Sequence, residues 1–168
     1  MVILPLGIRY FVKIKHIEAF KNKKFLKKLY SYTMNETLQK LRLSEQITKE
    51  LFKTIEDKGF ITHGKTEQQL CNEIVQVAKE DFGIEQYWGK KIVRTGINTL
   101  QPYISNPPNL LIQKDDILFF DFHPIFENWE ADLGRTYVLG NDPIKLKIKK
   151  DVEAAWYEAN TWYFNQTQ

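Results

Sequence analysis

The chain has 168 residues, of which 43% are hydrophobic and 27% are charged. This balance indicates a globular, soluble domain with its own core. No apolar run approaches the roughly 20 residues that cross a bilayer, and the single cysteine, Cys71, excludes a framework of internal disulfides. We therefore expect a cytoplasmic protein with no membrane partner, in which Cys71 packs in the interior rather than acting as a nucleophile.

The charge is distributed unevenly along the chain. Residues 1–33 hold eight basic residues and one acidic residue, whereas the other 135 hold 16 basic and 20 acidic residues. A basic segment can bind nucleic acid or an anionic membrane, or it can be a solvated appendage. We favour an appendage of uncertain role over residues 1–33 and a folded body over residues 34–168. We do not expect a nucleic-acid partner. We also do not expect a secretory signal, because no cleavage site of small residues follows the apolar start.

Helical patterns begin and end the body. Apolar residues form one stripe over residues 35–57, and Gly59 ends it. A second helix starts after Thr66, which can form a capping box with Gln69, and stops at Gly83. A third covers residues 145–162. The helical spacing of the third rests on Ile148, Val152, Ala155, Trp156 and Ala159.

Extended patterns lie between the second and third helices. Residues 91–95 suit a short strand, and the proline-rich residues 96–109 suit a loop. Residues 117–122 and 129–139 are apolar runs, and Pro124 and the pair Glu127-Asn128 mark the reversal between them. These runs predict a β-hairpin. The order helix, helix, strands, helix predicts an α+β fold.

Each predicted hairpin strand carries one carboxylate, Asp121 or Asp132. Aspartate is depleted in strands, and an ionised carboxylate inside a core is unfavourable unless it is paired or bound to a metal. Two neighbouring carboxylates repel each other, and a cation between them removes the repulsion. Alternatively, one aspartate pairs with Arg135 or a lysine while the other lies at a strand end. Strand periodicity directs Asp121 inward, on the face that also carries Phe119 and His123.

This segment resembles the first metal-binding hairpin of the pita-bread metallopeptidases, the family of methionine aminopeptidase, Xaa-Pro aminopeptidase and prolidase. Its two aspartates are eleven positions apart, as in that family, and Arg135-Thr136 completes the pattern Asp-x-x-Arg-Thr. Three further matches come in the same order as in the family. They are Gly64, Thr66 and Glu67 at a helix start, Gly96-Ile97-Asn98-Thr99 before the substrate pocket, and Asp115-Asp116 before the first strand.

The resemblance covers residues from about 34 to the end. It implies the first half of the pita-bread fold plus the opening helix of the second half. By resemblance, Asp121 would bind one divalent ion (Mn, Co, Zn or Fe), Asp132 would bridge two, and Arg135 would support a ligand or be structural. The implied function is that of an aminopeptidase or dipeptidase, most closely of the Xaa-Pro type, which cleaves an N-terminal peptide bond with a metal-activated water.

The chain also departs from the family pattern. The family site has two aspartates, one histidine and two glutamates, and the last three follow the Arg-Thr, whereas this sequence reaches Gln168 without them. His123 replaces a family glycine, and Tyr103 stands where the family has a histidine that contacts substrate. Tyr103 and His123 are therefore candidate substrate-binding residues. No catalytic residue is assigned.

Three interpretations remain open. The first is the N-terminal portion of a metallopeptidase, shortened and inactive alone. The second is a non-catalytic relative that binds a protein or peptide, which Tyr103 and His123 favour over a standard peptidase. The third is a creatinase-like amidinohydrolase, and the retention of both aspartates argues against it. We rank the first highest, with a peptide substrate as its partner, and we allow for a homo-oligomer.

Overall fold

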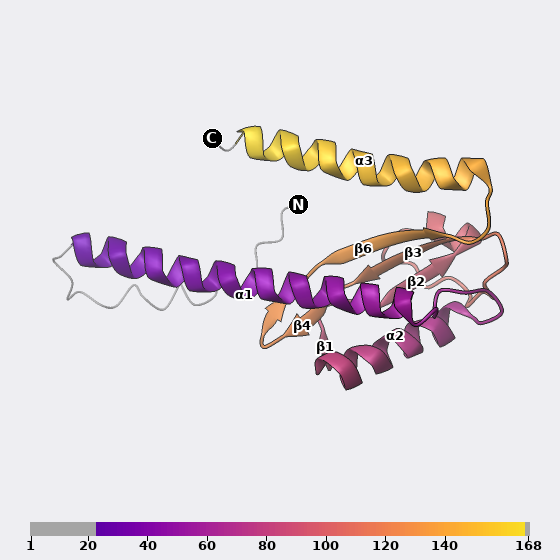
Figure 1. Cartoon of the computed structure of the whole chain (residues 1–168), viewed down its shortest axis with the longest axis horizontal. Coiled ribbons are helices and arrows are strands. Elements are labelled where there is room, and N and C mark those ends of the chain that lie inside the picture. The colour runs from indigo at the N-terminus through magenta and orange to yellow at the C-terminus, as the bar shows by residue number, and fades with distance from the viewer. Residues whose placement is uncertain (1–22, 167–168) are drawn as a thin grey trace. The chain divides into compact units, whose positions relative to one another are not determined.

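A computed structural model describes residues 23–166 (Figure 1). The expected appendage, residues 1–33, lies outside the residues whose side chains are described. The described part consists of three α-helices and two small antiparallel sheets, so the α+β prediction is confirmed. The helices are α1 (Lys23–Asp57), α2 (Glu67–Phe82) and α3 (Pro143–Gln166). One sheet has the order β1 (Gln86–Tyr87), β4 (Pro124–Phe126), β5 (Trp129–Glu130), and the other the order β2 (Ile92–Thr95), β3 (Ile117–Phe122), β6 (Leu133–Val138).

The first two helices end where the sequence predicts. Helix α1 begins at Lys23, earlier than the predicted residue 35, and stops before Gly59, which has a φ of +68°. Helix α2 starts with the predicted capping box, since the Thr66 side chain accepts a hydrogen bond from the Gln69 backbone and the Gln69 side chain accepts one from the Thr66 backbone. It ends at Gly83, which has a left-handed φ of +67°.

The core lies between these helices and one face of β3. The β3 residues with even numbers are fully buried and pack with residues of α1 and α2, and Cys71 is buried among them as predicted. The central members of this core are Leu51, Phe52, Ile55, Leu70, Ile74, Leu118, Phe120 and Phe122. The β3 residues with odd numbers, among them Asp121, are only half-buried. The face of β3 that was predicted to point inward is therefore the more open one.

The segment predicted as one hairpin forms two. The predicted strand of residues 129–139 is split into β5 and β6, which belong to different sheets. Glu127 and Asn128 have φ angles of +46° and +72° and form the two-residue turn between β4 and β5. The chain crosses from one sheet to the other at His123 and returns at Ala131, whose N–H donates to the Pro124 carbonyl (3.0 Å). Strands β3 and β6 remain antiparallel neighbours, with Asp121 opposite Gly134.

The C-terminal helix α3 contains the predicted helix of residues 145–162 and extends it in both directions. None of its residues is buried, and large apolar side chains such as Val152, Trp156 and Trp162 are more than half exposed. The predicted apolar stripe is thus present on the helix but is not part of the core. Within residues 23–166, no helix combines the length and the apolar character that crossing a membrane requires.

Candidate metal centre

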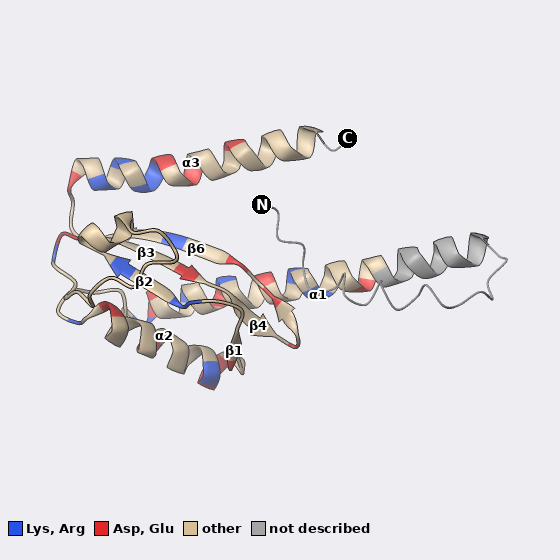
Figure 2. Cartoon of the chain, turned by 180° about the vertical axis from the view of Figure 1, so that it is seen from behind, with Lys and Arg blue, Asp and Glu red and all other residues tan. Residues whose placement is uncertain are grey.

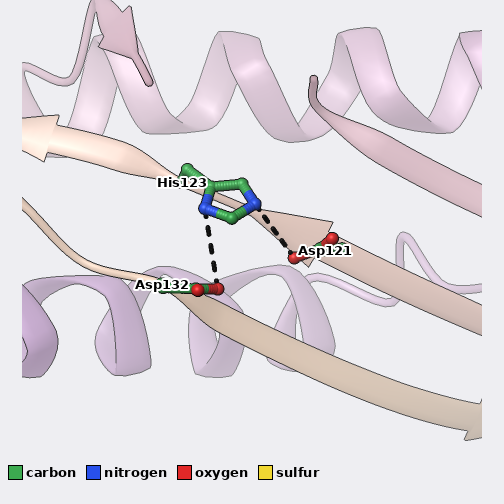
Figure 3. A group of neighbouring side chains, drawn as sticks. All are labelled: Asp121, His123 and Asp132. Carbon is green, nitrogen blue, oxygen red and sulfur yellow. Dashed lines mark ion pairs between the residues drawn. The ribbon is translucent and has the colours of Figure 1, made fainter. Parts of the chain in front are cut away.

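Three side chains with metal-binding groups meet where β3 ends and β6 begins. Asp121 is on β3, His123 follows β3 directly, and Asp132 precedes β6. Each offers one ligand atom, and these atoms all lie within 4.8 Å of one another. The His123 Nε2 atom lies 3.3 Å from Oδ1 of Asp121, and its Nδ1 atom lies 3.6 Å from Oδ1 of Asp132 (Figure 3). Figure 2 shows acidic positions on the strands in this region.

Strand pairing creates this arrangement. Asp121 lies between Ile92 of β2 and Gly134 of β6 in the register of the sheet, so all three positions share one face. Gly134 has no side chain to cover the aspartate. Since Phe122 of β3 is paired with Leu133 of β6, the residues adjacent to this pair, His123 and Asp132, are brought together. Antiparallel pairing therefore explains why residues eleven positions apart form one cluster.

Glu130 is a fourth group of the site that the sequence interpretation missed. Its Oε1 atom lies 3.4 Å from Nδ1 of His123, closer than the Asp132 carboxylate. The Glu130 side chain is 31% exposed, against 71% for Asp132. A signal for Glu130 does exist in the sequence, because residues two apart in an extended segment share a face. The buried Ala131 between them faces the other way.

Burial and mutual repulsion shape the electrostatics of these carboxylates. Burial raises the pKa of Asp121 above its ordinary value, and nearby Asp132 raises it further, although His123 and Arg94 act in the opposite direction. Burial likewise raises the pKa of Glu130, again opposed by His123. Three carboxylates around one imidazole are thus unfavourable in their fully ionised form unless a cation compensates them.

The surroundings of His123 fit such a cation. Both ring nitrogens are buried, and neither makes a hydrogen bond of good geometry with any residue that the structure describes, although carboxylate oxygens lie on both sides of the ring. A neutral imidazole has only one N–H, so its other nitrogen would present a lone pair to a carboxylate. A metal ion or a second proton removes this conflict. Two carboxylates and an imidazole suit Mn²⁺, Fe²⁺, Co²⁺ or Zn²⁺, so Asp121, His123 and Asp132 fit a divalent ion.

Comparison with known proteins agrees with this geometry. Residues 39–164 match metallopeptidase family M24. The chain belongs to this family. The resemblance noted in the sequence is thereby confirmed, as is the partial pita-bread fold. Members of M24 use divalent metal ions.

Individual relatives of this M24 chain are considerably longer than it is. An uncharacterized peptidase of Staphylococcus saprophyticus is 29% identical over 94 residues, which are 56% of this chain and 26% of the relative. The prolidase structure from Thermococcus sibiricus is 26% identical with a TM-score of 0.58, over 67% of this chain and 30% of that one. The prolidase from Pyrococcus horikoshii, 19% identical with a TM-score of 0.59, shares the fold over 94% of this chain and 44% of its own. The M24 chain thus spans less than half the length of these relatives.

Tyr103 lies beside the candidate metal-binding cluster of the M24 chain. Its ring meets the His123 ring edge-on at 6.4 Å between centroids. Its hydroxyl accepts a hydrogen bond from the backbone N–H of Lys90 (2.9 Å), and the Lys90 ammonium donates to the carbonyls of Tyr103 and Ile104 (both 3.0 Å). The buried Arg94 binds carbonyls of the same loop. These two cations hold the loop, and with it Tyr103, against the site.

The remaining residue that the sequence related to the site, Arg135, lies away from it. Arg135 of β6 is paired with Phe120 of β3, so it lies on the opposite face of the sheet from the neighbouring pair Gly134 and Asp121. Its guanidinium lies 5.5 Å from the centre of the Phe52 ring on α1 and donates to the Gly134 carbonyl. The implied support of a metal ligand by Arg135 is not seen, because strand alternation points it to the helix side.

Proposed function

We propose that this M24 chain supplies ligands to a divalent-metal centre of a peptidase that cleaves an N-terminal peptide bond. The proposed ligands are Asp121, His123 and Asp132. The observation that carries the proposal is the approach of their ligand atoms to within 4.8 Å of one another at the end of β3. The proposed ion is Mn²⁺, Co²⁺, Zn²⁺ or Fe²⁺, since these ions accept mixed carboxylate and imidazole ligands.

The proposed substrates are peptides of the Xaa-Pro type. The name of the Thermococcus sibiricus relative, prolidase, supports this class. Tyr103 is the proposed substrate contact, because the residue is 45% exposed and its ring borders the cluster. His123, which the sequence interpretation also assigned to substrate, is better placed to bind the ion because its nitrogens face carboxylates.

In the proposed site, the ion and the side chains would have different roles. A divalent ion at this site would lower the pKa of a coordinated water and polarise a peptide carbonyl. Asp121 and Asp132 would balance its positive charge and hold it in place. The Tyr103 hydroxyl already accepts the Lys90 N–H, so its own O–H remains able to donate to a peptide carbonyl. With three ligands, of which Asp132 is largely exposed, we expect one weakly bound ion and no turnover by this chain alone.

Calorimetric titration with Mn²⁺, Co²⁺ and Zn²⁺ tests the proposed centre. We expect one ion per chain, with binding abolished or strongly weakened in Asp121→Asn and in Asp132→Asn. Asp81→Asn is the matched control, because Asp81 is a carboxylate outside the site that pairs with Lys58. Absence of metal binding in the unaltered chain, or equal loss in the control, would overturn the proposal. Hydrolysis of Xaa-Pro and Met-Xaa peptides is measured in parallel, and turnover that depends on Asp132 would disprove the expected inactivity.

A second candidate function is peptide binding without catalysis. The observation in its favour is a pair of exposed aromatic residues next to His123, Trp88 and Tyr103. The Trp88 N–H donates to the His123 carbonyl (2.9 Å), which holds Trp88 next to the site. Saturable binding of the same peptides that is unaffected by Asp132→Asn would favour this function.

A further inference from the structure

Glu130 lies next to His123, although it is not one of the proposed metal ligands. Glu130 belongs to β5, where it is paired with Ile125 of β4. Its carboxylate lies 3.4 Å from Nδ1 of His123 and is more buried than that of Asp132. Because burial removes competing water, Glu130 is the stronger hydrogen-bond acceptor for this nitrogen.

The His123 ring has different neighbours on its two sides. Nε2 faces Asp121, and Nδ1 faces Glu130 and Asp132. The two nitrogens point in different directions, so only one of them can bind a given ion, and the other carries the N–H. The N–H is best placed toward Glu130, whose carboxylate is closer to Nδ1 and more buried than that of Asp132. The lone pair of Nε2 is then directed toward Asp121.

We propose that Glu130 is a positioning residue, which accepts a hydrogen bond from Nδ1–H of His123 and leaves Nε2 as the nitrogen that binds the divalent ion of the proposed centre. This inference rests on the proposed metal centre. A carboxylate that accepts the N–H of a metal-binding histidine fixes the tautomer and the orientation of its ring. Glu130 thus acts through His123 and does not itself need to touch the ion.

The tautomer of His123 can be read directly by NMR. The full chain is labelled with ¹⁵N-histidine, and long-range ¹H–¹⁵N correlation is recorded without metal at a pH where the ring is neutral. The chain has only three histidines, and His123→Asn assigns the signal. We expect the Nδ1–H form, which is diagnostic because a free histidine side chain in water favours Nε2–H. Glu130→Gln should lower the Nδ1–H population, whereas Glu127→Gln, in the turn of the same hairpin, should not.

Zinc titration supplies the second measurement. With Zn²⁺ bound, His123 should retain the proton on Nδ1, and Glu130→Gln should weaken Zn²⁺ binding about tenfold. Glu127→Gln should bind as the unaltered chain does, and unfolding curves of both variants check that the fold is intact. A Zn²⁺-bound ring with its proton on Nε2, or a Glu130→Gln variant with unchanged tautomer and affinity, would overturn the inference. If the unaltered chain binds no Zn²⁺, the proposed metal centre fails, and the metal-free spectra still decide whether Glu130 holds the ring.

Discussion

The Glu67 carboxylate accepts hydrogen bonds from the side-chain amide of Asn98, with Nδ2 lying 3.1 Å from Oε1 and 3.0 Å from Oε2. The backbone N–H groups of Thr95 (2.6 Å) and Leu110 (3.2 Å) donate to the same carboxylate. Glu67 is 6% exposed, so these bonds form away from water. They join the start of α2 to both ends of the loop that carries Tyr103.

We therefore expect Glu67→Gln to lower the free energy of unfolding by about 2 to 3 kcal/mol, because bonds to a charged acceptor are lost and an amide donor would face other donors. Urea unfolding measures the effect. Glu80→Gln, at an exposed position of α2, is the control and should change stability by less than about 0.5 kcal/mol. A similarly small effect of Glu67→Gln would contradict the structural role.

Gly89 allows Tyr103 to approach the site. A Cβ atom at Gly89 would lie 2.4 Å from the Tyr103 hydroxyl oxygen. Gly89→Ala should displace the ring, break the bond from the Lys90 N–H, and lower stability by about 1 kcal/mol. Adding Tyr103→Phe removes the clashing oxygen, so the double variant should lose less stability than the two single changes together. Additive losses in this double-mutant cycle would show that the two residues do not contact each other.

Tyr137 should make stability depend on pH in the alkaline range. Burial raises the pKa of Tyr137, and its hydrogen bond to Glu56 (2.6 Å) raises it further. Below about pH 10, the ordinary tyrosine pKa, the native bond is intact, and Tyr137→Phe should lower the free energy of unfolding by about 1 kcal/mol. At higher pH the unfolded chain releases the Tyr137 proton before the folded chain does, so the unaltered protein loses stability relative to the variant.

Unfolding curves at a series of pH values measure this difference. Tyr157→Phe, at an exposed position of α3, is the control and should follow the unaltered chain throughout. A gap between Tyr137→Phe and the unaltered chain that stays constant from neutral to alkaline pH would rule out the predicted linkage.

Residues 1–33 should be dispensable for folding of the body. The change from a basic to an acidic balance at residue 34 motivates this prediction, as does the M24 match, which begins at residue 39. A chain of residues 34–168 should unfold at nearly the same temperature as the full chain. Insoluble product, or a large drop in the unfolding temperature, would indicate that the basic segment packs against the body.

The sequence alone determined the features that depend on neighbours along the chain. The capping box of Thr66 and Gln69 and the left-handed Gly83 define α2 because their hydrogen bonds form within one helical turn. The spacing of Asp121 and Asp132 was also readable, since two antiparallel strands joined by a short connection bring such positions together.

Only the tertiary structure decided which faces are covered and which distant groups meet. It divided residues 129–139 between two sheets, which brings Glu130 to His123, and it turned Arg135 toward Phe52. It also left the apolar stripe of α3 outside the core. The physical reason is that periodicity states which residues share a face, whereas burial and electrostatic contact depend on what packs against that face.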